Sequence, residues 1–392
     1  MLEGKKEMKR KICAVITARA SYARIKSVLR EIKNNPDLQL QLVLGASLLL
    51  DRYGAAESII KRDGFHPSAH VYMVLEGENP VTMAKSTSIG LLELPTVFTD
   101  LKPDIVLTVA DRYETIATAI SASYMNIPVA HIQGGEITGS IDEKVRHAVT
   151  KLSNFHFVSN ESCAKRIIQM GERPESVFVT GCPSIDLARE VLKNPKLDFD
   201  VFSKYGGVGG ILDLQQGYIV VIQHPVTTEY EFAFEQISKT LQAIYELKLP
   251  TFWFWPNVDA GADKVSKGIR IFREKYNPDF IHFYKNMSPE DFLKLLYNSQ
   301  CIVGNSSAGV RECSFLGVPS VNIGSRQQGR ERGKNIIDVG YREEEIKKAV
   351  MEQIKHGRYP SEHIYGDGSA GRKIADILST IKIRNEKKFY YI

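Results

Sequence analysis

The sequence predicts an α/β protein built from two tandem doubly wound, Rossmann-like domains. Short apolar runs alternate with amphipathic stretches, which is typical of strands and helices in a parallel sheet. This alternation lapses around residues 194–217 and then restarts. The length of 392 residues also suits two domains, at roughly 100–200 residues per domain. Two such domains with facing strand ends place a ligand cleft between them.

The first half of the chain contains the elements of one doubly wound domain. Strands are expected at residues 11–17, 38–46, 104–110, 129–133, 154–160 and 176–181, with helices at 22–33 and 113–125. The strand segments are short, apolar and rich in β-branched residues, and the helical segments repeat apolar residues every three or four positions. The clearest unit is strand, helix, strand over residues 104–133, the order of a right-handed βαβ crossover.

The second half repeats this organisation. Strands are expected at residues 218–223, 250–256, 280–284, 301–305 and 319–324, with helices at 231–247, 289–298 and 309–316. The glycine-rich residues 206–210 are expected in an interdomain region or a surface loop. We therefore predict a first domain over residues 1–190, a second over 191–370, and a C-terminal helix and tail over 371–392 that packs back on the first.

Composition and charge exclude several classes of protein. Hydrophobic residues make up 43% and charged residues 25%, which is ordinary for a globular protein and excludes intrinsic disorder for most of the chain. The 51 basic and 46 acidic side chains give a net charge of +5. This excess is too small to indicate nucleic-acid binding without a clustered basic face. We expect no nucleic-acid partner.

Cysteine usage and the N-terminus favour a reduced, intracellular compartment. The five cysteines form no CxxC pair and are odd in number, which suits free thiols better than a disulfide framework or a zinc site. Only residues 12–16 form an apolar run near the N-terminus, whereas a secretory signal needs roughly 7–15 apolar residues and a membrane span about 20. His66 and His70 have ligand spacing but no carboxylate cluster. We expect a cytoplasmic protein with no membrane partner and no metal.

The segment GNSSAGVRE, residues 304–312, carries the most information about function. A buried strand is expected to end at its glycine, Ser306 and Ser307 make the turn, and a helix follows. Backbone N–H groups and hydroxyls at such a turn form an anion site suited to a pyrophosphate. Glu312, one to two turns into the helix, can accept hydrogen bonds from ribose hydroxyls. The alternative is that serine at a helix start is an ordinary N-cap.

Two further groups of basic residues follow strand ends. Arg19, Ser21 and Arg24 come directly after the first strand, at the sheet edge where ligands collect in doubly wound folds. Arg326 opens a basic loop after the strand at 319–324. Both groups suit a second anion contact, and both also fit the alternative of solvated surface charge.

Acidic residues follow the strand ends of the first domain. The candidates are Asp111, Glu136, Asp142 and Glu143. Paired carboxylates at a sheet edge can act as general base and general acid when burial separates their pKa values. For Asp142 and Glu143 the alternative is a charge that complements a helix dipole. Arg112 and His147 either pair with these acids or contact substrate.

Two polar residues of the second domain complete the candidate site. His224 follows the strand at 218–223, where it faces the expected cleft, although a single histidine is often only a packed or surface residue. Asn257 follows the aromatic strand at 250–256 and is placed to reach a base or a sugar.

Assembled, these segments resemble the hydrolysing UDP-N-acetylglucosamine 2-epimerases of sialic acid biosynthesis, both the stand-alone bacterial type and the epimerase part of the animal bifunctional enzyme. The match runs from about residue 11 to residue 381 and rests on nine ordered segments: TARASYAR, LLLDRYG, KPDIVLTVADR, HIQGGEITGSIDEKVRHAVTKL, GCPS, QHPVTTE, WPNVDAG, GNSSAGVRE and GSRQQGRERGKN. That family has a glycosyltransferase-B type fold with the active site in the interdomain cleft, which agrees with two tandem doubly wound domains.

The resemblance implies roles for the residues already singled out. Nucleotide-binding positions fall on Arg19, Ser306, Ser307, Glu312 and Arg326, with Asn257 near the nucleotide; the reacting groups fall on Asp111, Glu136, Asp142, Glu143 and His224. Non-hydrolysing relatives typically show His-Arg-Arg-Glu where this chain has QHPVTTE, and Ser-Gly-Gly where it has Ser-Ser-Ala. These departures favour the hydrolysing branch.

The resemblance also implies a reaction. UDP-N-acetylglucosamine and water would give N-acetylmannosamine and UDP through a 2-acetamidoglucal, with no cofactor because no hydride is transferred. Alternatives are the same reaction on GDP-N-acetylglucosamine, as in legionaminic acid pathways, a glycosyltransferase of the same fold, and a noncatalytic nucleotide-sugar sensor. We also expect a homo-oligomer, either a dimer or a tetramer.

Overall fold

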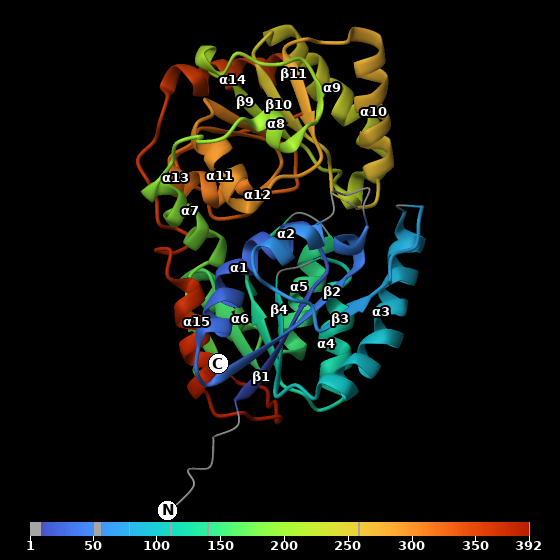
Figure 1. Cartoon of the computed structure of the whole chain (residues 1–392), viewed down its shortest axis with the longest axis vertical. Helices are drawn as coiled ribbons and strands as arrows, with labels where there is room; N and C mark the ends of the chain where they lie inside the picture. The colour runs from blue at the N-terminus through green and yellow to red at the C-terminus, as the bar shows by residue number, and fades with distance from the viewer. Residues whose placement is uncertain are drawn as a thin grey trace, which may run out of the picture.

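The computed structural model describes residues 9–50, 56–77, 79–109, 112–138, 141–257 and 259–391. Two α/β domains lie end to end along the long axis of the molecule, with the first at the bottom and the second at the top of Figure 1. Each domain has a seven-stranded sheet covered by helices on both faces. The predicted fold class is confirmed. Within the residues described, no helix combines the length and hydropathy of a membrane-crossing segment.

The first sheet is wholly parallel, with the strand order β3-β2-β1-β4-β5-β6-β7. Its strands are β1 (Arg10–Ile16), β2 (Leu38–Gly45), β3 (Ala69–Val71), β4 (Ile105–Val109), β5 (Val129–Ile132), β6 (Phe155–Val158) and β7 (Val177–Val179). The order reverses between β1 and β4. Doubly wound sheets bind ligands outside the carboxyl ends of the strands at this point of reversal. The loops after β1 and β4 are therefore placed to form a site.

Helices cover both faces of this sheet. They are α1 (Arg19–Asn34), α2 (Ala56–Arg62), α3 (Pro80–Leu101), α4 (Thr115–Tyr124), α5 (Ile141–Leu152) and α6 (Glu161–Gln169), and α7 (Pro183–Lys193) follows at the crossing to the second domain. Helix α3, which lies at the outer edge of the domain in Figure 1, was not predicted from the sequence. Asn79 and Thr82 cap it reciprocally, and Pro80 opens it. Only four of its residues are buried, so its apolar periodicity is weak.

The second sheet has the order β14-β13-β12-β9-β10-β11-β8. Its strands are β8 (Val208–Gly209), β9 (Ile219–Ile222), β10 (Thr251–Phe254), β11 (Ile281–Tyr284), β12 (Cys301–Gly304), β13 (Ser320–Ile323) and β14 (Ile336–Val339). All its pairs are parallel except β8 with β11. Its order reverses between β9 and β12, so the loops after these strands meet the cleft.

The edge strand β8 differs from the prediction of a linker or surface loop. Gly209 has a φ of +128°, and a Cβ there would lie 2.2 Å from the Ile281 carbonyl oxygen. A Cβ on Gly210 would lie 1.6 Å from the Asp279 carbonyl oxygen. Only glycine permits so close an approach of two backbones, which explains how a glycine-rich segment joins a sheet.

The remaining helices cover the second sheet and return the chain to the first domain. They are α8 (Val201–Tyr205), α9 (Ala233–Leu247), α10 (Ala262–Tyr276), α11 (Pro289–Tyr297), α12 (Ser307–Val310), α13 (Glu312–Leu316), α14 (Glu343–His356) and α15 (Ala370–Thr380). Short 3₁₀ turns lie at Ala46–Leu49, Pro174–Ser176, Leu214–Gln216 and Thr227–Phe232. Helix α15 packs against α1, where Ile374 and Leu378 join the core of the first domain.

The chain crosses between the domains twice, and the two crossings touch. The Cys182 N–H donates to the Tyr365 carbonyl oxygen at 2.7 Å. A Cβ on Gly181 would lie 3.3 Å from the Gly366 Cα. The predicted boundary at residue 190 falls inside α7, which contributes Ile185 and other apolar side chains to a core of the second domain.

Candidate functional site

A pocket opens between the two domains at the carboxyl ends of both sheets. Residues of α1 and α2 form its wall on the first domain, and loops after β9, β10, β11 and β12 contribute to its wall on the second. Its polar lining residues include Arg19, Arg24, His224, Asn257, Asn286, Ser306, Ser307 and Glu312, and its apolar ones include Phe254, Met287, Phe292 and Leu293. Such a wall suits a ligand with one flat apolar part and one strongly polar part.

The serine turn follows β12, as predicted. Ser306 Oγ accepts a hydrogen bond from the Ala308 N–H at 3.3 Å, so Ser306 is the N-cap of α12. The prediction of one helix over 309–316 is wrong, because α12 has only four residues and α13 begins after Arg311. A helix this short carries little macrodipole. Positive charge at this turn must therefore come from side chains.

Arg19 and Arg24 supply that charge. Burial, with repulsion from Arg112, lowers the pKa of Arg19 to about 10. Burial, with repulsion from Arg311 and Arg330, lowers the pKa of Arg24 to about 9. Both side chains stay charged at neutral pH, and a bound anion would relieve the repulsion between these cations. The wall of the pocket is therefore electrostatically suited to a polyphosphate.

Glu312 has a carboxylate oxygen without a hydrogen-bond partner. The residue is only 9% exposed and lines the pocket, and no donor among the described residues bonds its buried Oε2. A buried polar atom with no partner costs free energy, about 1–3 kcal/mol for a neutral group and more for a charged one. A hydroxyl of a bound ligand would satisfy this oxygen.

His224 is held as a neutral hydrogen-bond donor. The Asn257 N–H donates to His224 Nδ1 at 3.1 Å, so the proton of the neutral ring lies on Nε2. Burial, with repulsion from Arg326 and Arg19, holds the pKa of His224 well below its ordinary value. Asn305 clamps its backbone, accepting from the His224 N–H at 2.7 Å and donating to its carbonyl at 2.8 Å.

Arginines of the first domain reach across the cleft to the loop after β10. Arg112 contacts the carboxylates of Asp259 and Glu114, each at 2.8 Å. Arg19 Nη2 donates to Asn257 Oδ1 at 3.2 Å. These contacts draw the loop of the second domain against the start of α1. Among the described residues, the acids that pair with Arg112 are therefore Glu114 and Asp259, one of them on the opposite domain, rather than the candidate acids named from the sequence.

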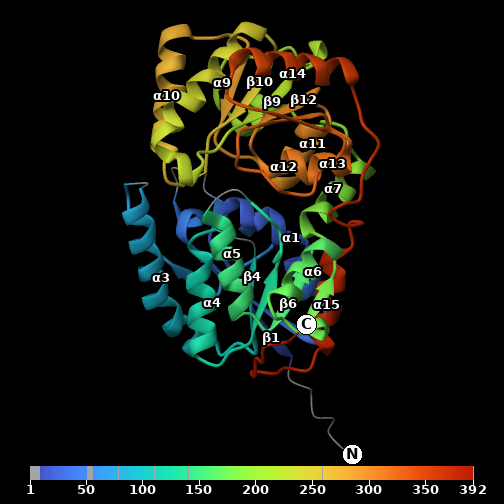
Figure 2. The same cartoon turned by 180° about the vertical axis from the view of Figure 1, so that it is seen from behind.

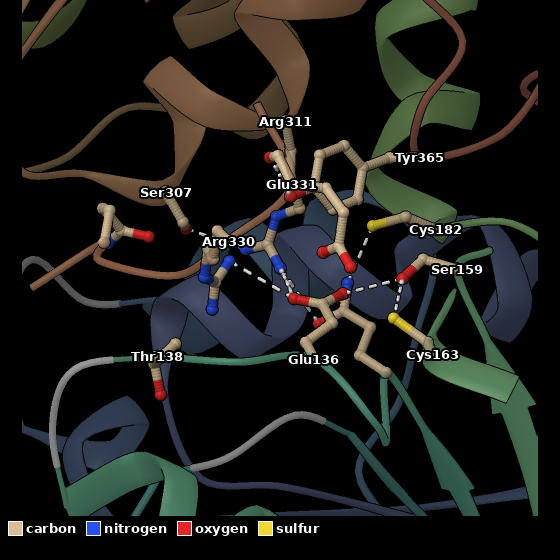
Figure 3. A network of polar contacts seen from close by, with 12 residues as sticks. Glu136, Thr138, Ser159, Cys163, Cys182, Ser307, Arg311, Arg330, Glu331 and Tyr365 are labelled. Atoms are coloured by element: carbon tan, nitrogen blue, oxygen red, sulfur yellow. Dashed lines mark hydrogen bonds and ion pairs between the residues drawn. The ribbon is translucent and has the colours of Figure 1, made fainter. Parts of the chain in front are cut away.

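Glu136 lies at the centre of a buried network that joins the domains (Figure 3). It is 1% exposed; Ser159 Oγ donates to Oε1 at 3.0 Å, while Arg311 and Arg330 lie 3.1 and 3.3 Å from Oε2. Burial alone would raise the pKa of Glu136, but the two guanidinium groups outweigh it and lower the pKa. Glu136 is not among the residues that line the pocket. It is an ion-pair partner here.

Asp142 and Glu143 stand in the first turn of α5, where acidic residues complement the helix dipole. Glu143 Oε2 accepts from the Thr138 N–H at 2.9 Å, and its Oε1 lies 3.5 Å from His147 Nε2. Asp142 lies close enough to Arg326 to favour its charged form. The position of Glu143 matches the alternative given for it, a charge at a helix start that complements the helix dipole.

Three further predicted residues, besides those of the network and of α5, also lie away from the pocket wall or outside the described chain. Ser21 is 1% exposed, does not line the pocket, and its Oγ has no partner among the described residues. Arg326 donates to the Asn305 carbonyl oxygen at 3.2 Å, beneath the serine turn. Asp111 lies outside the described residues. The predicted substrate contact of Ser21 therefore has no support in this structure.

The sequence analysis missed Arg311 and the apolar wall formed by Met287, Phe292 and Leu293. Nothing local marks Arg311, since an arginine in a short amphipathic segment usually faces solvent.

All five cysteines are buried and form no disulfide. In the part of the chain that the structure describes, no group of three or more His, Cys, Asp or Glu side chains is arranged to hold a metal ion.

Sequence comparison decides the family. The family model described as UDP-N-acetylglucosamine 2-epimerase matches residues 30–379. The chain belongs to this family. Among its curated relatives, the UDP-N,N'-diacetylbacillosamine 2-epimerase (hydrolyzing) of Legionella pneumophila is 33% identical over 97% of this chain and 98% of the relative. The polysialic acid biosynthesis protein P7 of Escherichia coli is 32% identical over 87% of this chain and 85% of the relative.

Solved structures of family members share the fold. The UDP-GlcNAc 2-epimerase of Neisseria meningitidis bound to UDP-GlcNAc matches with a TM-score of 0.76 at 20% identity, over 94% of this chain and 99% of that chain. The Methanocaldococcus jannaschii UDP-GlcNAc 2-epimerase in complex with UDP-GlcNAc and UDP matches with a TM-score of 0.76 at 18% identity, over 94% and 99%. The chain therefore has the glycosyltransferase-B type fold that the family resemblance implied.

Proposed function

We propose that this 2-epimerase is hydrolysing and converts UDP-N-acetylglucosamine and water into N-acetylmannosamine and UDP. The observation that carries the proposal is the unpartnered oxygen of Glu312 in a pocket that also presents Ser306, Ser307 and two arginines. One wall thus offers an acceptor for ribose hydroxyls beside donors for a diphosphate. Two relatives named as hydrolysing enzymes, which align with 97% and 84% of this chain, support the hydrolysing branch.

The nucleotide is held by groups of distinct chemistry. Glu312 accepts hydrogen bonds from the ribose hydroxyls. Arg19, Arg24 and the two serine hydroxyls bind the diphosphate. Its charge offsets the repulsion of Arg19 by Arg112 and of Arg24 by Arg311 and Arg330. The apolar side chains of the pocket, which include Phe254, Phe292 and Met287, pack against the base.

The sugar reacts by elimination and rehydration. A carboxylate base removes the proton on C2, the bond from C1 to the diphosphate oxygen breaks, and UDP leaves with those electrons. The product of this step is a 2-acetamidoglucal. Water then adds across the double bond, placing a hydroxyl on C1 and a hydrogen on the opposite face of C2. The candidate proton carriers are Asp111, Asp142 and Glu143, which follow strand ends of the first domain.

His224 assists departure of the diphosphate as a neutral donor. Because its Nδ1 accepts from the backbone, its Nε2–H is available to an oxygen of the leaving group. Arg19 and Arg24 balance the charge that grows there. Preorganised donors of this kind often supply the largest single catalytic contribution.

A second substrate is favoured by one observation. The Legionella pneumophila relative, 33% identical over almost its full length, is named for UDP-N,N'-diacetylbacillosamine, and a Campylobacter jejuni relative at 31% identity is named for its GDP or UDP form. The same chemistry would act on either sugar, because the reacting atoms are C1 and C2. The purified protein should therefore be given UDP-N-acetylglucosamine, GDP-N-acetylglucosamine and UDP-N,N'-diacetylbacillosamine side by side, without any acceptor.

Release of a free 2-epimerised sugar from at least one donor is the expected result. If nucleotide binds but no sugar is released, the noncatalytic sensor is favoured. If sugar leaves the donor only when an acceptor is added, a glycosyltransferase is favoured.

Turnover in D₂O tests the mechanism separately. The product must carry deuterium at C2, and a product with the original hydrogen there would refute elimination.

A further inference from the structure

The Ser307 hydroxyl receives hydrogen bonds from both domains at once. Arg24 Nη2 of the first domain lies 3.2 Å from Ser307 Oγ, and Arg311 Nη2 of the second lies 2.7 Å from it. A hydroxyl oxygen has two lone pairs and one hydrogen. Both lone pairs are therefore engaged by guanidinium donors, and the hydrogen must point elsewhere.

The orientation of that hydrogen follows from its surroundings. Within the described residues, Ser307 Oγ donates no hydrogen bond to the protein, and Ser307 lines the pocket. Its O–H is thus directed at whatever the pocket holds. Two adjacent cations also polarise the hydroxyl, which strengthens it as a donor to an anionic oxygen.

Arg311 is itself fixed from the opposite domain. It is 1% exposed, and a fully buried guanidinium is stable only with a charged partner. Glu136 provides that partner at 3.1 Å, and Gln133 Oε1 accepts from the same Nη1 at 3.5 Å. Figure 3 shows Arg311 between Ser307 on one side and Glu136 on the other. One guanidinium nitrogen of Arg311, Nη1, therefore contacts Glu136 of the first domain, and the other, Nη2, donates to Ser307 in the pocket.

We infer that Arg311 is a positioning residue, anchored across the domain interface by Glu136, that fixes the Ser307 hydroxyl as a donor to the ligand diphosphate. This inference rests on the proposed function, because it needs a nucleoside diphosphate at the serine turn. It also changes the role proposed for Glu136. Both of its carboxylate oxygens already accept from protein donors, so it acts by holding Arg311 rather than by carrying a proton.

A double-mutant cycle on UDP binding tests the link between Arg311 and Ser307. Calorimetry at fixed ionic strength gives the Kd of UDP for the wild type, Ser307→Ala, Arg311→Lys and the double variant. We expect each single change to weaken binding by about 10-fold, the low end for a lost charge-assisted hydrogen bond. The double variant should bind no more weakly than the weaker single variant, because both changes remove the same oriented hydroxyl. Independent effects, multiplying to about 100-fold, would overturn the inference.

Arg166→Lys is the matched control. Arg166 also forms a cross-domain ion pair, with Glu331, and donates to the Gly135 carbonyl oxygen at 2.8 Å, but it does not contact Ser307. It should leave the Kd of UDP within about twofold of wild type, inside the scatter expected for independent sites. Equal weakening by Arg166→Lys and Arg311→Lys would mean that any loss of a cross-domain pair loosens the pocket, and would refute a specific role for Arg311.

Glu136→Gln and Glu136→Asp give a second, independent measurement. If Glu136 only anchors Arg311, Glu136→Gln lowers kcat/KM by a similar factor at every pH, and Glu136→Asp recovers part of the loss. If the Glu136→Gln variant instead loses one limb of the plot of kcat/KM against pH, Glu136 carries a proton in the reaction, and the inference is overturned. If Arg311→Lys does not fold, Glu136→Asp with Ser307→Ala completes the cycle, since Glu136 reaches Ser307 through Arg311.

The binding data also separate this inference from the proposed function. If the wild type binds neither UDP nor GDP, the proposed function fails and the inference with it. If the wild type binds UDP and the cycle is additive, only the role of Arg311 fails.

Discussion

Replacing Glu312 by glutamine tests the nucleotide site without altering its shape. The carboxylate is 9% exposed, and its Oε2 has no hydrogen-bond partner among the residues that the structure describes. A charged hydrogen bond to a ribose hydroxyl contributes about 1.5–3 kcal/mol, so its loss should raise the Kd of UDP by about 10- to 100-fold. Because no protein donor bonds that oxygen, Glu312→Gln should keep or raise the melting temperature. The pairing of weaker binding with undiminished stability is the signature expected.

Glu172 provides a control, because its buried carboxylate, unlike that of Glu312, is paired with side chains of the protein. It is 4% exposed and its carboxylate contacts Lys151, His156 and Lys387 at 2.5–3.2 Å. Burial would raise the pKa of Glu172, but these hydrogen bonds outweigh it and lower the pKa to about 2. Glu172→Gln should therefore lower the melting temperature and leave the Kd of UDP unchanged.

Calorimetric titration with UDP and thermal melts of both variants complete the experiment. The reasoning fails if Glu312→Gln binds UDP as tightly as the wild type, or if it binds weakly only because it is less stable. It also fails if Glu172→Gln weakens UDP binding to the same degree, since the effect would then not belong to the pocket.

Three other predictions follow from the same contacts. Asp111→Asn should lower turnover by about 10²–10⁴-fold with nearly normal UDP affinity, whereas normal specific activity with a lower melting temperature would give it a structural role. Burial lowers the pKa values of His224 and His156 in the folded state, so the unfolded chain takes up protons first below a pH of about 6.5. As the pH is lowered below that value, the free energy of unfolding should decrease by up to about 1.4 kcal/mol per pH unit for each histidine. Urea titrations that show no such decrease would contradict this. Lys387→Met removes a donor from Glu172 and should cost about 1–3 kcal/mol of stability without changing UDP affinity; an unchanged urea midpoint would contradict it.

The alternation of strands and helices was predictable from sequence because parallel sheets bury both faces of their strands. The run at residues 11–17 became β1, and the helix expected at 22–33 lies within α1, which ends one residue later, at Asn34. The failures have physical causes. Helix α3 buries few side chains, and β8 is held by the close approach of backbones at Gly209, which hydrophobic periodicity does not register.

The site was predictable only where it depends on strand ends. Ser306, Ser307, Glu312 and Arg19 reach the pocket because their position after a parallel strand dictates it. Arg311 was missed because its role depends on Glu136, which is far away in sequence. The sequence indicated Glu136 as a carboxylate after a strand end, but neither its burial nor the guanidinium groups that neutralise it. The cytoplasmic location, the homo-oligomer and the domain boundaries stay predictions.

The contact between the two chain crossings has a mechanical consequence. The chain leaves the first domain at Gly181 and returns at Gly366, both with φ values in the left-handed region, at +90° and +117°. Topologically, the second domain is thus a cassette inserted into one surface loop of the first. Tension applied between β1 and α15 would load the first domain and bypass the second. A short linker joining residue 181 to residue 366 would keep all seven strands of the first sheet, so a different cassette could be grafted at the same point.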